Sequence, residues 1–312
     1  MIPTTDARAA LSAAPTWPTS VTVVDVTPRD GLQDAAAFVP TAKKLAFIEA
    51  LIDAGVRNIE ATSFVHPRWV PQLADADDLG ARLPRREGVV YSALTPNMRG
   101  YERARAAGVD EIVLVISASE SHNKANMNRS IDDSLAQLSE VAAQARKDGT
   151  AMRGGVATAF GCPFEGAVAP EAALRIARGY VEMGVHLVSL ADTIGIAQPR
   201  QVYELFTRLR AETPVEIPLA AHFHDPRGFG LANVFAALQA GVTTFDAAVG
   251  GLGGCPYAPG STGNLSTEAL VGFLEAMGLS TGVALDRLAA ARAQILADIA
   301  SGEPVDTSHS IR

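Results

Sequence analysis

The histidines His222 and His224, two residues apart, are the most chemically suggestive pair in this sequence. They end a short apolar run that is followed by a glycine turn, a pattern typical of a buried strand. Because strand side chains alternate between faces, both imidazoles point to one side and could bind the same metal ion. Asp225 is adjacent in sequence and could orient one of the rings by bonding the ring nitrogen that faces away from the metal. Two separately hydrogen-bonded histidines are an equally good interpretation of this pair taken alone.

A glycine-rich loop at residues 250–260 is the second informative stretch, with 5 glycines among its eleven residues. Such a loop carries high conformational freedom, which is typical of lids over active sites. Cys255 lies in its middle, where there is little core to bury it, so it could act as an acid or base once the loop closes. We interpret the other cysteine, Cys162, as a small buried hydrophobic residue.

The elements that position these residues alternate between strand-like and helix-like patterns about eight times, and several of the helices end at a glycine. This alternation predicts a parallel sheet, and its repeat number predicts a closed TIM (β/α)8 barrel with a C-terminal helical extension. A doubly wound sheet is disfavoured because no Gly-x-Gly-x-x-Gly follows the first strand. Strands are expected at 21–26, 56–61, 89–94, 111–116, 152–160, 186–190, 217–223 and 243–249; helices are expected at 41–54, within 72–82, and at 98–107, 130–147, 170–183, 199–212, 231–240, 267–277 and 285–299. The expected domains are a loose arm at 1–20, one catalytic barrel at 21–300 and a flexible tail at 301–312.

Polar residues at the carboxyl ends of these strands should meet at the mouth of the barrel, where such folds place their active sites. Besides the two histidines, they are Arg29, Asp30, Glu60, Ser63, Asp192 and, beyond the glycine-rich loop, Asn264. Each has an ordinary explanation alone: Asp30 as a turn former, Glu60 as an ion-pair partner of Arg29, or Asp192 as a helix N-cap. Together they would cost desolvation energy, which favours a functional site.

The candidate ligands are two imidazoles, the Asp30 carboxylate and the Asn264 amide oxygen. No thiolate pair accompanies them, so we expect one Mg²⁺ or Mn²⁺ ion rather than structural zinc. Such an ion would act as a Lewis acid on substrate oxygens.

Composition narrows the class of protein. The chain has 312 residues, is 48% hydrophobic and 19% charged, and carries a formal net charge of −8. This acidic balance disfavours nucleic acid as a partner, and no run is long enough to span a membrane. With 2 cysteines and no secretory pattern at the start, we expect a cytoplasmic protein.

The motifs at residues 27–33, 59–64, 192–195, 222–225 and 250–260 together resemble the 3-hydroxy-3-methylglutaryl-CoA lyase family of metal-dependent TIM-barrel enzymes. The resemblance runs from about residue 21 to 299, and the cysteine loop is its most specific part. It implies divalent-metal-dependent retro-Claisen cleavage of 3-hydroxy-3-methylglutaryl-CoA, or a close 3-hydroxy-3-alkylglutaryl-CoA, to acetyl-CoA and a keto acid. It also implies an acyl-CoA thioester substrate, no organic cofactor and a homo-oligomer.

The resemblance further implies roles for individual residues. Arg29 would stabilise enolate charge, and Cys255 would transfer a proton from the lid. Asp192 and Glu60 match carboxylates of the site, and Ser63 and Gly254 join Arg29 in binding substrate. The metal ligands would be Asp30, His222, His224 and Asn264.

Some positions depart from the family pattern and leave the acyl group open. Pro226-Arg227 stands where Thr-Tyr is usual, with Arg227 adding a cation close to the site, and the segment 157–160 ends in Phe160 rather than small and polar residues. The tail at 306–312 has no cysteine.

Three other functions are alternatives to this interpretation. A Claisen synthase of the same superfamily, a transferase, usually carries further domains after the barrel. A biotin-dependent carboxyltransferase would need a metal-bridging lysine, and the strand ends offer none. A non-catalytic metal-binding scaffold gives no reason for Arg29 or Cys255.

Overall fold

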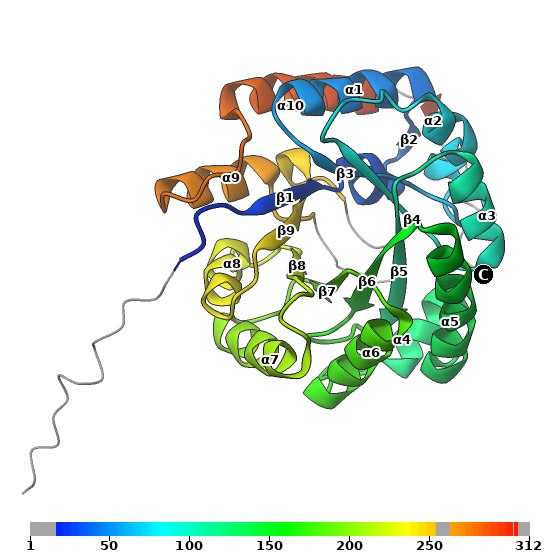
Figure 1. Cartoon of the computed structure of the whole chain (residues 1–312). Helices are drawn as coiled ribbons and strands as arrows, with labels where there is room; N and C mark the ends of the chain where they lie inside the picture. The colour runs from blue at the N-terminus through cyan, green and yellow to red at the C-terminus, as the bar shows by residue number, and fades with distance from the viewer. Residues whose placement is uncertain (1–16, 254–262, 302, 305–312) are drawn as a thin grey trace, which may run out of the picture.

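A closed barrel of parallel strands forms the centre of this computed structural model, which describes residues 17–253, 263–301 and 303–304 (Figure 1). Hydrogen bonds join the strands in the order β1, β3, β4, β5, β6, β7, β8 and β9, and β9 pairs back with β1. The predicted TIM barrel is therefore confirmed. The strand bounds are β1 Thr22–Asp25, β3 Asn58–Ser63, β4 Val90–Leu94, β5 Glu111–Ser117, β6 Ala151–Ala157, β7 Leu187–Asp192, β8 Leu219–Phe223 and β9 Thr244–Ala247.

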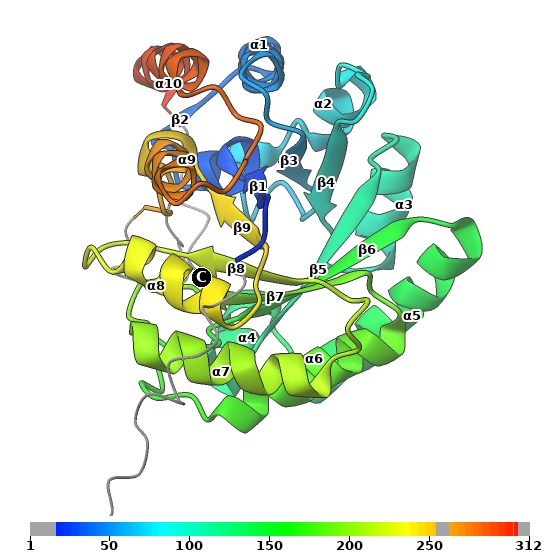
Figure 2. The same ribbon diagram turned by 60° about the vertical axis from the view of Figure 1, so that its left-hand side comes forward.

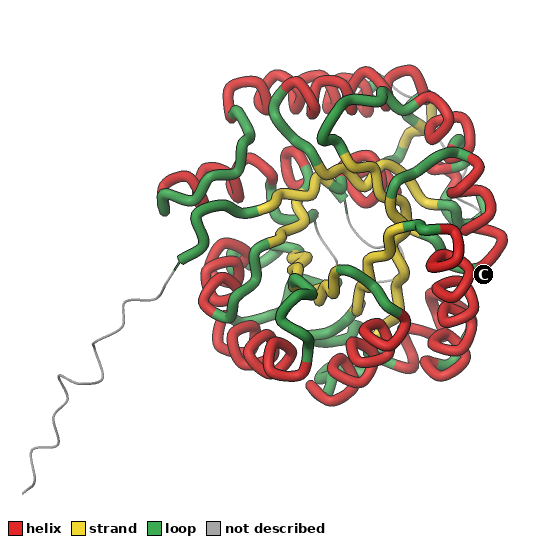
Figure 3. The backbone as a smooth tube through the Cα atoms, viewed as in Figure 1, coloured by secondary structure: helices red, strands yellow, loops and turns green. Residues whose placement is uncertain are grey.

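Helices surround the barrel on its outside (Figure 3). The C-terminal helix α10 packs beside α1, as Figures 1 and 2 both show, and forms the predicted helical extension. The helix bounds are α1 Thr41–Asp53, α2 Ala76–Arg82, α3 Met98–Ala106, α4 Glu120–Met127, α5 Ile131–Asp148, α6 Pro170–Met183, α7 Pro199–Glu212, α8 Gly230–Gln239, α9 Thr267–Ala276 and α10 Leu285–Ala300. In the part of the chain that the structure describes, no helix has the length and apolar character needed to cross a bilayer.

Helix ends follow the local chemistry of the sequence. Helix α5 begins after Ser130, whose Oγ accepts a hydrogen bond from the Asp133 amide at 3.0 Å. Helix α6 begins at Pro170, which needs no amide partner there, and ends before Gly184, which has a φ of 79°. These signals explain why the predicted bounds of α6, 170–183, agree with the structure.

The structure differs from the expected elements in several places. Helix α4 and the two-stranded sheet of β2 (Ala37–Phe38) and β10 (Glu303–Pro304) were not expected. A 3₁₀ turn at Pro71–Leu73 precedes a shorter α2. Strand β6 ends before Thr158, whose φ of 53° turns the chain out of the sheet. The pairing of β10 with β2 lies within the range 301–312, which we expected to be a flexible tail.

Candidate active site and metal centre

The turn after β1 carries Arg29 and Asp30 and is held by buried hydrogen bonds. The amides of Asp30 and Gly31 both donate to the Val26 carbonyl, at 2.8 and 3.1 Å. Below the turn, Asp25 accepts from the Thr27 amide at 3.0 Å and from the hydroxyl of Thr267 in α9 at 2.8 Å. Burial raises the pKa of Asp25 to about 6, although these hydrogen bonds act to lower it. The turn is thus fixed from below, and Arg29 and Asp30 project into the barrel mouth.

Asp30, His222 and His224 form one buried cluster, with a ligand atom of each within 4.8 Å of the others. The Nε2 atoms of the two rings lie 3.2 Å apart, and the Asp30 Oδ2 atom lies 3.8 Å from that of His222 and 3.7 Å from that of His224. The two histidines therefore face a common point, as the metal interpretation requires.

Asn264 completes the cluster from the strand bridge that it forms with His224. Its Nδ2 donates to Asp30 Oδ2 at 2.7 Å and to the Leu252 carbonyl at 2.9 Å. Its Oδ1 is buried and has no hydrogen-bond partner among the described residues. An orphaned amide oxygen beside two imidazoles and a carboxylate fits the nitrogen and oxygen ligands of a divalent cation.

Arg29 links this cluster to Glu60 on β3. Its Nη2 donates to Glu60 Oε2 at 2.9 Å, and its Nη1 pairs with Asp30 Oδ1. Burial alone would raise the pKa of Asp30, but Arg29 and the two histidines lower it. The ion-pair interpretation of Glu60 is therefore correct, although the other Glu60 oxygen and the nearby Ser63 hydroxyl are buried without a partner among the described residues.

Asp192 ends β7, as expected, and holds the loop that follows. Its carboxylate accepts from the amides of Ile196 at 3.0 Å and Ala197 at 2.9 Å, before α7 begins. Burial raises its pKa to about 6 despite these bonds, and His222 lies near enough to lower it. Asp192 therefore anchors the loop, and a part in the chemistry stays a prediction.

Two residues that sequence reasoning missed support His222 from below. Asp246 on β9 lies 3.1 Å from His222 Nδ1 through its Oδ2, and Arg153 on β6 donates to both Asp246 oxygens at 2.6 and 2.5 Å. Burial opposes the ionisation of Asp246, but Arg153 and His222 overcome it and lower its pKa to about 2. The expected role of Asp225 was wrong, because its carboxylate accepts from the Gly230 amide at 2.8 Å and caps α8 instead. Asp246 is a lone acid in an apolar strand, which is the only signal of it in the sequence.

The glycines that flank residues 254–262, Gly253 and Gly263, lie close to the cluster. Gly253 has a φ of 104°, and a Cβ there would lie 2.6 Å from Asn264 Nδ2 and 2.7 Å from the Asp30 carbonyl. Gly263 is adjacent to Asn264, and a Cβ there would lie 1.7 Å from the Gly251 carbonyl oxygen. Only glycine fits such contacts without displacement. Gly254 and Cys255 lie outside the described residues.

The remaining sequence expectations concern residues outside the cluster. Cys162 is buried as expected, although its Sγ also lies 2.9 Å from the Ser119 hydroxyl. Phe160 is buried between Phe206 and Phe223, with ring centroids 6.2 and 6.1 Å away. Phe160 therefore packs in the core, while Arg227 is exposed.

The family model described as HMGL-like matches residues 20–295. The chain belongs to the HMGL-like family. Among curated relatives of this HMGL-like chain, the hydroxymethylglutaryl-CoA lyase of Bacillus subtilis is 46% identical over 275 residues, which are 88% of this chain and 92% of that protein.

Solved structures of HMGL-like proteins share the fold closely. The crystal structure of the Bacillus subtilis HMG-CoA lyase gives a TM-score of 0.88 at 44% identity, over 93% of this chain and 97% of that one. An HMG-CoA lyase from Acinetobacter baumannii, in complex with coenzyme A and 3-methylmalate, gives 0.87 at 40% identity, over 94% and 96%. The resemblance inferred from the motifs is thus confirmed at the level of the family.

Proposed function

We propose that this HMGL-like protein is a carbon–carbon lyase that cleaves 3-hydroxy-3-methylglutaryl-CoA to acetyl-CoA and acetoacetate. The identity to hydroxymethylglutaryl-CoA lyases supports the reaction, and the relative that holds coenzyme A supports an acyl-CoA thioester as substrate. A close 3-hydroxy-3-alkylglutaryl-CoA, giving the homologous keto acid, is the variation that the departures at residues 226–227 leave open.

The observation that carries the proposal is the guanidinium of Arg29 beside the cluster of Asp30, His222 and His224. A retro-Claisen cleavage removes the proton of the tertiary hydroxyl, and the electron pair of the breaking carbon–carbon bond passes to a thioester enolate. A divalent cation, when bound, supplies Lewis-acid polarisation of that hydroxyl. Asp30, His222, His224 and Asn264 would hold it.

Arg29 is placed to stabilise the charge that develops on the enolate oxygen. It is largely buried, so its field is little screened by water, and Glu60 and Asp30 fix its orientation through two ion pairs. Fixed donors of this kind stabilise a transition state without reorganising. Ser63, whose buried hydroxyl has no partner among the described residues, is the proposed polar contact to substrate.

Proton transfer is assigned to two residues. Asp192 has a pKa of about 6, which suits a group that accepts a proton near neutrality. Cys255 is proposed to return a proton to the enolate carbon, and Gly254 to bind substrate, because Gly253, which precedes them, lies against Asp30 and Asn264. Mg²⁺ and Mn²⁺ both suit these ligands, and no organic cofactor is required.

The assay uses the full chain with 3-hydroxy-3-methylglutaryl-CoA and follows products by mass. Chelator-treated protein should be inactive and should regain activity with Mg²⁺ or Mn²⁺. Full activity without metal would contradict the metal assignment. The second candidate function is a Claisen-type synthase of the same superfamily. Release of coenzyme A from acetyl-CoA plus a 2-keto acid, without lyase activity, would favour that function.

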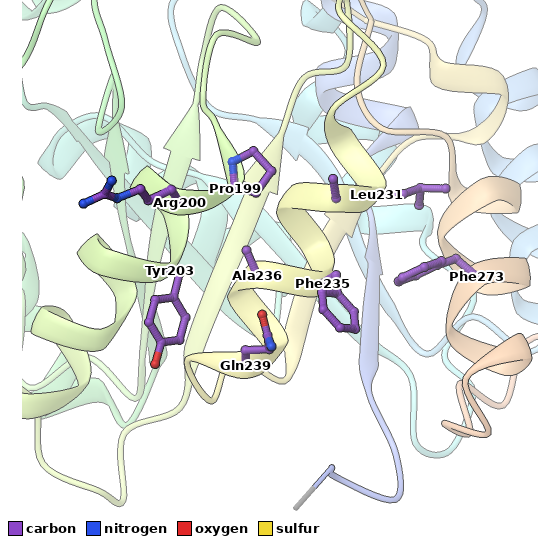
Figure 4. A pocket seen from close by; sticks show the side chains of 9 residues that line it. Pro199, Arg200, Tyr203, Leu231, Phe235, Ala236, Gln239 and Phe273 are labelled. Atoms are coloured by element: carbon purple, nitrogen blue, oxygen red, sulfur yellow. The ribbon is translucent and has the colours of Figure 1, made fainter. Parts of the chain in front are cut away.

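We also propose that the protein is a homo-oligomer that pairs through the outer face of α8. That helix contains no charged residue, although the chain carries a net charge of −8, so two copies could meet there without repulsion. Beside it lies a groove of about 600 Å³ lined by Tyr203, Phe235 and Phe273 from three successive helices (Figure 4). Arg200, which pairs with Glu204, also lines it. Phe235→Glu should convert the assembly to monomers in light scattering; unchanged mass would contradict this interface.

The proposal also covers the domain bounds of the chain and its cellular compartment. We place one catalytic unit at residues 21–300, with the arm and tail outside it, and the protein in the cytoplasm. The low cysteine count supports the reducing compartment.

A further inference from the structure

Arg153 is a buried cation in the barrel interior that the proposed chemistry does not use. It lies on β6, while its partner Asp246 lies on β9, and β7 and β8 stand between these strands in the sheet. Its side chain therefore crosses the interior, where it is 3% exposed. Taking a guanidinium out of water costs desolvation free energy unless it is paired and hydrogen-bonded. A role for this buried pair beyond stability is therefore worth seeking.

The contacts of Arg153 fix the orientation of one carboxylate. Its Nη2 donates to both oxygens of Asp246 and also lies 3.2 Å from the Ser189 hydroxyl on β7. A carboxylate held at both oxygens cannot rotate freely about its Cβ–Cγ bond. Asp246 is therefore held with one oxygen toward β8.

That oxygen faces His222, which lies opposite Asp246 in the register of β8 and β9. An ionised carboxylate only accepts hydrogen bonds, so the Nδ1 atom of His222 must carry the hydrogen. In the neutral ring the lone pair then lies on Nε2, the atom that faces Asp30 and His224. The ring is thus oriented, and its tautomer selected, for binding a cation.

We propose that Arg153 and Asp246 are positioning residues that fix the orientation and tautomer of His222 for metal binding. The inference rests on the metal centre of the proposed function, and Arg153 acts only through Asp246. The alternative is that the pair stabilises the barrel and leaves the metal centre unaffected.

The test measures Mn²⁺ affinity of the full-length protein by the electron paramagnetic resonance signal of free Mn²⁺, with no substrate present. Asp246→Asn keeps the shape but offers an amide that can donate to Nδ1, and should weaken Mn²⁺ binding roughly 10- to 100-fold. Arg153→Met should weaken it by at least roughly 10-fold on the same grounds. The double variant should bind no more weakly than Asp246→Asn alone, because the two residues act in series.

Lys44→Met is the matched control. Lys44 in α1 is also a fully buried cation, paired with Asp75 at 2.6 Å, and its loss should lower the unfolding temperature but leave Mn²⁺ affinity unchanged. If Arg153→Met does not fold, nitrogen-15 spectra of the histidine side chains decide instead. Wild-type His222 should show hydrogen on Nδ1, and Asp246→Asn should move it to Nε2.

The possible failures are distinguishable. Variants that bind Mn²⁺ as the wild type does, or losses that add in the double variant, overturn the positioning role and leave the proposed lyase reaction untouched. A wild-type protein that binds no Mn²⁺ overturns the metal centre and this inference together. A protein that binds Mn²⁺ in the expected pattern but cleaves no thioester overturns only the proposed reaction.

Discussion

His122 should make the protein sensitive to mild acid through its burial rather than through catalysis. The residue lies in α4 and is 1% exposed. Its Nδ1 lies 2.7 Å from the Ser117 hydroxyl at the end of β5, and its Nε2 has no partner among the described residues. Burial without a charge partner lowers its pKa from 6.5 to about 4.

The direction of the effect follows from proton linkage. Between these two pKa values the unfolded chain binds a proton at His122 and the folded chain does not, so acid favours unfolding. The contribution is fully present above pH 6.5, is lost as the pH falls toward 4, and amounts to roughly 3 kcal/mol over that window. Below the lower value both states are protonated and the loss stops.

Urea denaturation of the wild type and of His122→Phe between pH 7.5 and 4.5 measures this contribution. The free energy of unfolding of the wild type should fall relative to that of the variant by roughly 3 kcal/mol across the range. Asp25 and Asp192, whose raised pKa values of about 6 have the opposite effect, are common to both proteins and cancel in the difference.

Ser117→Ala is the control, because it removes the hydroxyl and keeps the buried imidazole. Its unfolding free energy should lie below that of the wild type by about 1 kcal/mol at every pH, the typical loss for one hydrogen bond. A constant difference between wild type and His122→Phe at all pH values would refute the linkage argument.

The remaining predictions concern the site and the core. Arg29→Met should lower kcat roughly 10²- to 10³-fold with little change in substrate binding, which steady-state kinetics would show; near-normal turnover would contradict the enolate role. Cys255→Ser should lose most turnover while Cys162→Ser does not, and substrate should protect Cys255 from alkylation; similar turnover in both variants would return Cys255 to a structural role. Phe206→Ala, which empties a fully buried position against Phe160, should cost about 3–5 kcal/mol of unfolding free energy in urea titrations, and a loss below 1 kcal/mol would show that the core relaxes around it.

The fold could be predicted because its signals are local and repeated. Pro170 and Gly184 mark both ends of α6 by their own backbone chemistry, and the apolar strand runs need no knowledge of their neighbours. Helix α4 was missed because its residues, Glu120–Met127, are mostly polar and show no apolar period. Strands β2 and β10, of two residues each, are too short to leave a pattern.

Site residues that are close together in the sequence could be predicted, whereas those brought together by strand pairing could not. His222 and His224 are close in sequence, so their shared face could be inferred from strand geometry alone. The support of His222 comes from Asp246 on the neighbouring strand, whereas Asp225 is adjacent in sequence and turns away to cap α8. Sequence proximity favoured the wrong carboxylate, because strand register between β8 and β9 cannot be read from a single sequence.

The pairing of β1 with β9 has a consequence for the order of folding. Closure of the ring joins Thr22 to Thr244, and the Asn264 amide reaches Asp30 across 234 residues of chain. Contacts of such sequence separation form late, since the entropy of closing the loop must be met before they contribute. During synthesis, Asp30 cannot contact Asn264 until the 234 residues that separate them have left the ribosome. On the proposed metal assignment, a refolding chain that binds Mn²⁺ tightly has closed its ring, so Mn²⁺ binding would report the last step of folding.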